Sequence, residues 1–242
     1  MHDARMAVTG RLELAAFDAP DIKGLAEFYT ALTGWETVRD VGDWITIRAS
    51  DGQEIAFQKA PDHVPPRWPG QELPQQFHLD LFIEDHEAAA KRAEELGATR
   101  LADGEHWITL ADPAGHPFDL CRKEGVGPEM TLFAVTIDAP DAIGLARFYA
   151  ALMGMEVTYE GPEGALIADG GKSVMFQQVA EYTPPRWPDP AAPQQAHLDI
   201  LVDDLDAGEA RALELGATRL PGDEKTFRVF ADPAGHPFCL TS

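Results

Sequence analysis

Two polar side chains occupy one face of an otherwise apolar strand in the segment FHLDLF, residues 77–82. Side chains alternate between the two faces of a strand, so His78 and Asp80 share one face and the leucines share the other. An imidazole beside a carboxylate is a combination used for general acid–base catalysis. Either Asp80 or Asp119 could supply the carboxylate that pairs with His78. The alternative interpretation is a hydrogen-bonded histidine that only stabilises the sheet interior.

A hairpin occurs twice with one difference that bears on chemistry. ADPAGHPF at residues 111–118 returns unchanged at 231–238, and the next residue is Asp119 in one copy and Cys239 in the other. Asp and Pro open such a turn and Gly supplies the positive φ, so we expect both turn histidines, His116 and His236, to serve the turn. We expect Cys239 to be an inert packing residue, with His197 as its one candidate activator.

These residues belong to a repeat that spans nearly the whole chain. APDIKGLAEFYTALTGWE (19–36) returns as APDAIGLARFYAALMGME (139–156), and PPRWP, PQQxHLD and ELGATRL also return at an offset of 119 or 120. This period is far longer than that of a solenoid unit. The repeat predicts two homologous domains, residues 1–123 and 130–242, joined by a Gly/Pro linker at 124–129.

Each half shows the same order of strand and helix patterns. A strand at 11–17 precedes a helix that Asp18 and Pro20 could start, with apolar residues at helical spacing until Gly34. Three short strands separated by Gly/Asp turns follow, and the whole order then repeats after a Pro-rich loop. Each domain is therefore predicted to hold two βαβββ modules, which makes four in the chain.

Composition narrows the classes of partner. The 242 residues carry a formal net charge of -22, which repels phosphate backbones and anionic lipid, so nucleic acid and membrane surfaces are poor partners. Apolar residues make up 45% of the chain, but no apolar run approaches a membrane span, and the N-terminus lacks the layout of a secretory signal. Two cysteines form no disulfide framework, so we expect a cytoplasmic protein.

The paired modules, the FYxALxG helix, the HLDL strand and the DPxGHPFxL hairpin together resemble the vicinal oxygen chelate superfamily. That superfamily includes glyoxalase I, extradiol dioxygenases and bleomycin-resistance proteins. The resemblance implies an α+β fold in which the two modules of each domain curl into a cup-shaped half-barrel. In the superfamily's enzymes, side chains from four strands of the half-barrel hold a divalent metal, which the substrate chelates through two neighbouring oxygens.

The resemblance also implies where a metal would bind. Carried over residue by residue, the family's ligand positions in the first domain are Glu13, Gln58, His78 and Asp119. In the second domain they are Phe133, Gln177, His197 and Cys239. An amide is a poor ligand and phenylalanine is none, so we expect either no metal or one divalent ion (Mn, Fe, Zn, Ni, Co or Mg) held in the first domain by Glu13, His78 and Asp119.

Other residues are candidates for ligand contact because they are polar or aromatic and lie near these positions. Trp68 belongs to the PPRWP segment, which would form a rim that stacks on a ligand, or else would pin a long loop to the domain. Trp35 and His106 are replaced in the second half, which makes the first half the more polar and the expected active one. The predicted ligand-binding set is Trp35, Gln58, Trp68, Asp80, His106, Gln177 and His197.

Three functions remain open at this point. The favoured one is a small-molecule-binding protein that holds an aromatic natural product, as bleomycin-resistance proteins do. The second is a metal-dependent lyase, isomerase or dioxygenase in which His78 and Asp119 are catalytic. The third is a metal-free enzyme that uses His78 as an acid–base group. We expect the two domains to pair within one chain, giving a pseudo-symmetric monomer or a homodimer of it.

Overall fold

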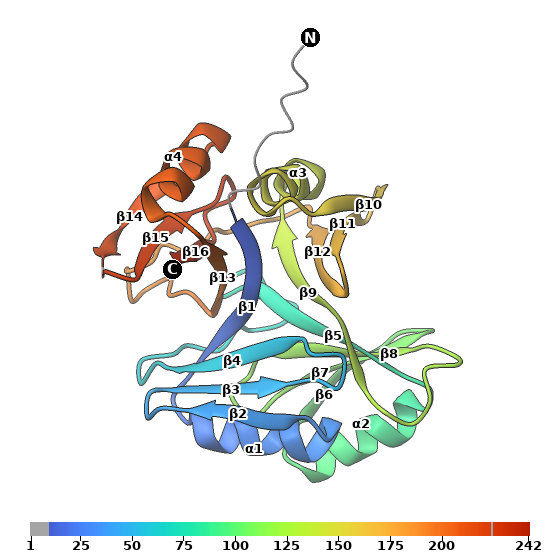
Figure 1. Cartoon of the computed structure of the whole chain (residues 1–242). Helices are drawn as coiled ribbons and strands as arrows, with labels where there is room; N and C mark the ends of the chain where they lie inside the picture. The colour runs from blue at the N-terminus through green and yellow to red at the C-terminus, as the bar shows by residue number, and fades with distance from the viewer. Residues whose placement is uncertain (1–9, 224) are drawn as a thin grey trace.

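The computed structural model describes residues 10–223 and 225–242, and these form four βαβββ modules (Figure 1). The first repeat holds modules one and two. Module one consists of β1 (Gly10–Ala19), α1 (Ile22–Thr33), β2 (Glu36–Asp40), β3 (Trp44–Arg48) and β4 (Glu54–Lys59). Module two consists of β5 (Phe77–Ile83), α2 (His86–Glu95), β6 (Thr99–Asp103), β7 (Trp107–Ala111) and β8 (Pro117–Arg122).

The second repeat holds modules three and four in the same order. Module three consists of β9 (Thr131–Ala139), α3 (Ala142–Met153), β10 (Glu156–Gly161), β11 (Gly164–Asp169) and β12 (Lys172–Gln178). Module four consists of β13 (Ala196–Val202), α4 (Leu205–Leu215), β14 (Thr218–Asp223), β15 (Phe227–Ala231) and β16 (Pro237–Thr241). The predicted module order and the α+β class are therefore confirmed.

Helix α1 illustrates how local sequence sets the elements. Its apolar positions, among them Leu25 and Phe28, recur at helical spacing and are buried. The Asp21 side chain accepts a hydrogen bond from the backbone of Gly24 at 3.0 Å, and Gly34 ends the helix with φ of 79°. The predicted start at Asp18 was wrong, because Asp18 still belongs to β1 and its side chain is buried in the sheet face.

The strands form two eight-stranded sheets, and each sheet takes one module from each repeat. The first sheet, here sheet A, has the order β14-β15-β16-β13-β1-β4-β3-β2. Sheet B has the order β10-β11-β12-β9-β5-β8-β7-β6. The expectation that both modules of one domain share a half-barrel is corrected here: β1 pairs with β13, and β5 pairs with β9 (Figure 1).

The exchanged pairing decides which side chains meet. In sheet A, Ala16 on β1 lies opposite His197 on β13, and in sheet B, His78 on β5 lies opposite Thr136 on β9. The helices pair within each repeat instead: α1 packs on α2, and α3 packs on α4 (Figure 1). Repeat one and repeat two thus form separate helical layers, while each sheet runs from one repeat into the other.

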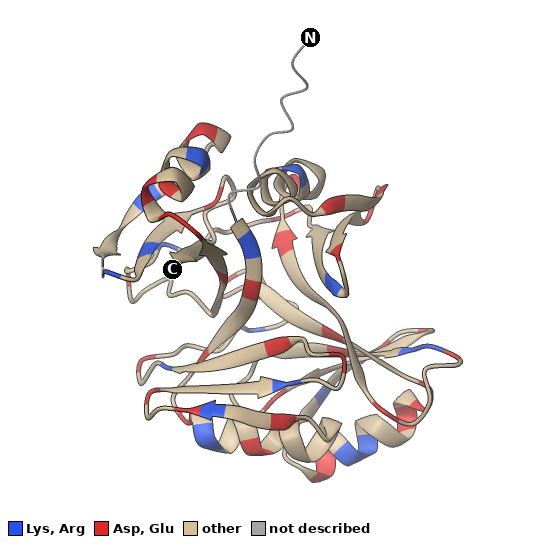
Figure 2. Cartoon of the chain, viewed as in Figure 1, with Lys and Arg blue, Asp and Glu red and all other residues tan. Residues whose placement is uncertain are grey.

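Acidic residues occur on strands, helices and loops of both repeats, as the red segments of Figure 2 show. They outnumber basic ones by 41 to 19 in the whole sequence. In the part of the chain that the structure describes, no helix is long and apolar enough to cross a membrane.

Candidate functional site

Each sheet carries a cavity over its central strands, and the larger one lies on sheet B. This wide cavity has a volume of about 540 Å³, within the range of small-molecule sites. Its floor is polar and is formed by His78, Asp80 and Asp119. Aromatic side chains form much of its wall: Trp68, Phe82 and Trp107. A polar floor beneath aromatic walls suits a flat ligand that carries oxygen atoms.

The three floor residues come from two adjacent parallel strands. Asp80 on β5 lies in register with Asp119 on β8, and His78 precedes Asp80 by two residues on the same face. One ligand-type atom from each of the three lies within 4.8 Å of the others. His78 Nε2 is 3.7 Å from Asp80 Oδ1, and the hydroxyl of Thr136 donates a hydrogen bond to Asp80 Oδ2. The floor is therefore a compact group of one imidazole and two carboxyls.

A second polar layer beside the floor fixes the orientation of the imidazole. Gln75 Nε2 lies 3.3 Å from His78 Nδ1 and within 3.2 Å of both carboxylate oxygens of Asp138. Gln177 Nε2 also donates to Asp138, at 3.2 Å. With the Gln75 amide donating, Nδ1 is an acceptor, so neutral His78 carries its proton on Nε2. His78 is then a hydrogen-bond donor on the side that faces Asp80.

Asp119 is the floor residue with free hydrogen-bonding capacity. Its Oδ1 is buried and has no hydrogen-bond partner among residues 10–223 and 225–242. Burial raises the pKa of Asp119 above its usual value, although the nearby His78 and a hydrogen bond from Thr109 lower it. Buried polar atoms rarely stay unpaired, so this oxygen is a binding position for a ligand group or an ion.

The floor also fits a divalent metal by donor type. An imidazole with two carboxylates suits the divalent ions of the first transition series, and Asp119 Oδ1 offers an oxygen with no competing contact. Coordination through His78 Nε2 would require that nitrogen to lose its proton. The Gln75 amide would then have to turn so that its oxygen accepts a hydrogen bond from Nδ1.

The equivalent cavity on sheet A is smaller and less polar. This narrow cavity has a volume of about 320 Å³, and its floor holds His197, Asp199 and Cys239. His197 Nε2 lies 3.4 Å from Asp199 Oδ1, and Gln194 donates to Asp18 at 3.0 Å. The two cavities thus share the His-x-Asp strand and the Gln–Asp layer, and differ where a thiol replaces the carboxyl of Asp119.

Equivalent positions of the two sheets carry a tryptophan and a glycine. Trp44 lies opposite Gln58 in sheet A, and Gly164 lies opposite Gln177 in sheet B. The indole of Trp44 lies in the narrow cavity, with its ring centroid 6.4 Å from that of His197. At Gly164, where φ is 151°, a Cβ would lie 1.9 Å from the carbonyl oxygen of Phe176, so no side chain fits there.

The structure brings together six of the predicted site residues and separates four others. The wide cavity is lined by His78 and Asp119 together with four of the predicted ligand contacts: Trp68, Asp80, His106 and Gln177. Gln58 and His197 line the narrow cavity instead, because their strands belong to sheet A.

The predicted metal set of Glu13, His78 and Asp119 is corrected by the strand pairing. Glu13 lies in sheet A, where it accepts a hydrogen bond from Thr241 at 2.8 Å, and Asp80 takes its place in the cluster. The predicted ligand contact of Trp35 is also corrected. Trp35 is buried in the core and donates to the carbonyl of Met130 at 3.1 Å.

Sequence reasoning missed several residues around the wide cavity. Asp138 was not among the predicted site residues, although the period of two places it on the same face of β9 as Thr136. Gln75 stands in the repeated PQQ segment, which could have marked it, since its copy Gln194 plays the same part beside Asp18. Gly164 gave no signal, because only its tight contact with a neighbouring strand shows its role.

Comparisons with known proteins agree with this fold. A family model described as a glyoxalase-like domain matches residues 15–121 and again residues 134–241. The anthracycline biosynthesis protein DnrV of Streptomyces peucetius is 30% identical over 223 residues, covering 83% of this chain and 80% of that protein. The anthracycline biosynthesis protein DauV of Streptomyces sp. (strain C5) matches with the same identity and coverage.

Solved structures share the fold at low sequence identity. Glyoxalase I of Zea mays aligns with a TM-score of 0.66 and 18% identity, over 97% of this chain and 92% of that one. A putative dioxygenase of Bacillus subtilis aligns with a TM-score of 0.62 and 13% identity, over 96% and 85%. The two matches to the family model span most of the sequence, and the chain therefore belongs to the glyoxalase-like domain family of the vicinal oxygen chelate superfamily.

Proposed function

We propose that the chain binds a flat, oxygen-bearing aromatic small molecule in the wide cavity and takes part in the handling of a natural product. The observation that carries this proposal is the unpaired buried Oδ1 of Asp119, next to the imidazole of His78, on the floor of an aromatic-walled cavity. A hydroxyl of the ligand would donate to Asp119, and a neighbouring carbonyl would accept from His78 Nε2.

Two further observations support the ligand class. The cavity of about 540 Å³ is large enough for a fused-ring compound, and Trp68 and Trp107 offer flat surfaces for stacking. The curated relatives with 30% identity carry names that refer to anthracycline biosynthesis, and anthracyclines are fused-ring hydroxyquinones. Such compounds present a hydroxyl in the peri position beside a carbonyl, so a donor and an acceptor lie side by side, which matches the acceptor and donor on the cavity floor.

The test is the binding of a hydroxyanthraquinone probe, followed by tryptophan fluorescence and titration calorimetry. The Asp119→Asn variant keeps the shape and removes the charged acceptor, so its affinity should fall by about 30-fold, as expected for about 2 kcal/mol. The exposed Asp203→Asn variant, on the loop after β13, is the matched control and should bind as the wild type does. Equal affinity of all three proteins would reject the proposal.

A second candidate function is a metal-dependent lyase, isomerase or dioxygenase at the same floor. The observation that favours it is the cluster of His78, Asp80 and Asp119, which would hold the ion. A bound divalent ion would act as a Lewis acid on the oxygens of a chelating substrate. In that case His78 would be a metal ligand rather than a proton donor, and the aromatic walls would still orient the substrate.

Metal content per chain distinguishes the two candidates. Protein purified without a metal-binding tag should hold about one ion per chain if the second candidate is right, and both His78→Ala and Asp119→Ala should lose it. Absence of bound metal after dialysis against Mn, Fe, Zn, Ni and Co would leave the binding function. Turnover of a substrate by that metal-free protein would instead assign acid–base chemistry to His78.

A further inference from the structure

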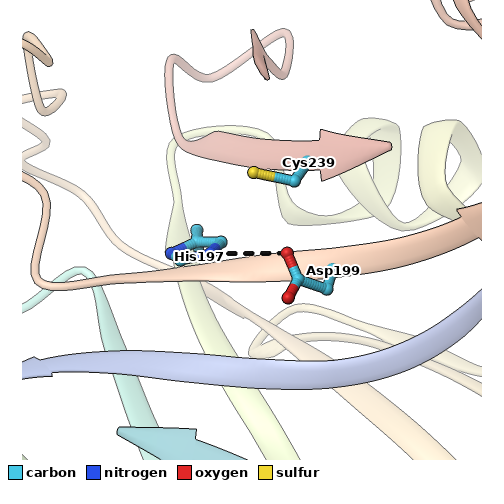
Figure 3. A group of neighbouring side chains, drawn as sticks. All are labelled: His197, Asp199 and Cys239. Atoms are coloured by element: carbon cyan, nitrogen blue, oxygen red, sulfur yellow. Dashed lines mark ion pairs between the residues drawn. The ribbon is translucent and has the colours of Figure 1, made fainter. Parts of the chain in front are cut away.

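The narrow cavity holds a thiol beside an imidazole and a carboxylate. Cys239 on β16 lies over His197 and Asp199 on β13, as Figure 3 shows. The Cys239 sulfur, a ring nitrogen of His197 and a carboxylate oxygen of Asp199 all lie within 4.8 Å of one another. The imidazole is thus placed between a group that can give it a proton and a group that stabilises its charged form.

The surroundings of His197 favour its protonated form. Burial opposes that form, but hydrogen bonding to Asp199 and Cys239 and their charges outweigh burial and raise the pKa of His197 well above its usual value. An imidazolium next to a cysteine favours the thiolate, which is the nucleophilic form. The expectation of an inert Cys239 therefore does not follow from its surroundings.

The other cysteine of the chain lies in the opposite environment. Cys121 lines the wide cavity, where burial and the carboxyl groups of Asp80 and Asp119 raise its pKa far above the usual range. Its sulfur donates a hydrogen bond to Asp80 over 3.8 Å. Cys121 is therefore held as an unreactive thiol and serves as an internal reference for Cys239.

The space next to Cys239 suits a small, flat ligand. Trp44, Trp187 and Phe227 line the cavity, whose volume is about 320 Å³. His197 lies on the floor with 5% of its surface exposed, and its Nδ1 has no hydrogen-bond partner in the described part of the chain. The unpaired nitrogen gives the floor unused capacity to donate a hydrogen bond to an oxygen of a ligand.

We propose that Cys239 is a nucleophile that adds to a flat α,β-unsaturated carbonyl compound, such as a quinone, bound in the narrow cavity. The sulfur forms a bond to the β-carbon, the π electron pair of the C=C bond shifts to form a double bond between the α-carbon and the carbonyl carbon, and the π pair of the C=O bond moves onto the oxygen. The proton that Cys239 has passed to His197 neutralises the resulting enolate. The adduct contains all atoms of the thiol and the electrophile, and no oxidant or reductant is consumed.

The test is the rate of labelling of each cysteine in the full chain by 1,4-benzoquinone and by N-ethylmaleimide, read by peptide mass spectrometry. Cys239 should react at least about tenfold faster than Cys121 at both pH 6 and pH 8. Besides Cys239 and His197 themselves, the charged or titratable groups on the surrounding strands are Asp199 on β13 and Asp18 and Glu13 on β1.

Two variants separate activation by the imidazole from simple access to the sulfur. His197→Gln should slow the labelling of Cys239 at pH 6 by about tenfold or more, and Asp199→Asn, which keeps the imidazole, should slow it less. Labelling of Cys239 no faster than that of Cys121 or glutathione would overturn the proposal, and this comparison needs no variant. Unchanged rates in both folded variants would also overturn it. Binding of the hydroxyanthraquinone probe in the wide cavity is measured in a separate experiment. Failure of the proposed binding function and failure of the Cys239 proposal are therefore distinguishable.

Discussion

Gln76 and Gln195 exchange hydrogen bonds between equivalent positions of the two repeats. The backbone N–H of each donates to the side-chain Oε1 of the other at 3.0 Å. Each side-chain amide also donates to a proline carbonyl of the opposite repeat, Gln76 to Pro193 at 3.0 Å and Gln195 to Pro74 at 2.8 Å. Since both glutamines stand directly before a central strand, this exchange fixes the strands that carry His78 and His197.

Replacing either glutamine should therefore destabilise the protein. Gln76→Ala and Gln195→Ala each leave a buried N–H and a carbonyl without a partner, which should cost about 2 kcal/mol or more. Urea unfolding gives the free energy, and the exposed Gln71→Ala is the control with little expected effect. The double variant should lose about the sum of the two single losses, because the two side chains make different hydrogen bonds. A loss no larger than that of Gln71→Ala in either single variant would contradict the argument.

Comparison of the two repeats also predicts a stabilising substitution in the first half. In the second half, Tyr182 donates to the carbonyl of Ala234 and lies 2.9 Å from His236 Nε2. In the first half, His63 occupies the position of Tyr182, and among the described residues His116 Nε2 and His63 Nδ1 have no partner. His63→Tyr should give His116 that partner and stabilise the protein by about 1 kcal/mol at pH 7.5.

The same variant should reduce the loss of stability in acid. Burial, followed by the charge of His116, lowers the pKa of His63 to about 4. The neutral imidazole therefore contributes stability above the unfolded value of about 6.5, and this contribution is lost as pH falls from about 6.5 towards 4. Unfolding at pH 7.5 and pH 5 should show a larger advantage of His63→Tyr at pH 5. In the second half, Tyr182→Phe removes the hydroxyl that contacts Ala234 and His236, so it should destabilise the protein. A neutral effect of both His63→Tyr and Tyr182→Phe would contradict the argument.

Much of the fold was predictable from local patterns, but the pairing of modules was not. The spacing of apolar residues and the turn at Gly34 are local, and they gave the right order of helices and strands. Whether β1 pairs with β5 or with β13 depends on contacts between residues more than a hundred positions apart, and both pairings use the same strand patterns. This one unresolved choice moved Glu13 and Gln58 out of the predicted site.

Site residues with an obvious chemical group were easier to find than those that shape the cavity. His78 and Asp119 were recognised by residue type and strand position, and the structure places both on one floor. Gly164, opposite Gln177, has no room for a side chain because a Cβ there would lie against the backbone of Phe176. Such a steric constraint exists only once the strands are paired, so no sequence pattern reveals it.

The buried carboxyl of Asp119, for which we propose a role in binding, should lower the stability of the folded protein at neutral pH. Burial raises its pKa, so the folded protein holds this proton more tightly than the unfolded chain does. Stability should then fall as pH rises from the ordinary aspartate value of about 3.9 through the raised value. Asp119→Asn should unfold at a temperature a few degrees higher than the wild type at pH 7, where ~1 kcal/mol corresponds to about 2–4 °C, with the difference shrinking near pH 4. A variant less stable than the wild type at pH 7 would show that the charged carboxylate is well solvated in the cavity.

Trp44 should act as the size filter of the narrow cavity. Its indole lies near His197, and its Nε1 donates to the Thr46 hydroxyl at 3.0 Å, which holds the ring in place. Trp44→Ala should enlarge the narrow cavity, because the indole lines it. Labelling of Cys239 by a three-ring quinone should then rise by about tenfold or more, while labelling by 1,4-benzoquinone should change little, since the small ring already fits. Trp35→Phe is a control for loss of a tryptophan away from both cavities, and it should leave the ratio of the two rates as in the wild type. A parallel rise of both rates in Trp44→Ala would show a general loosening of sheet A instead of a filter.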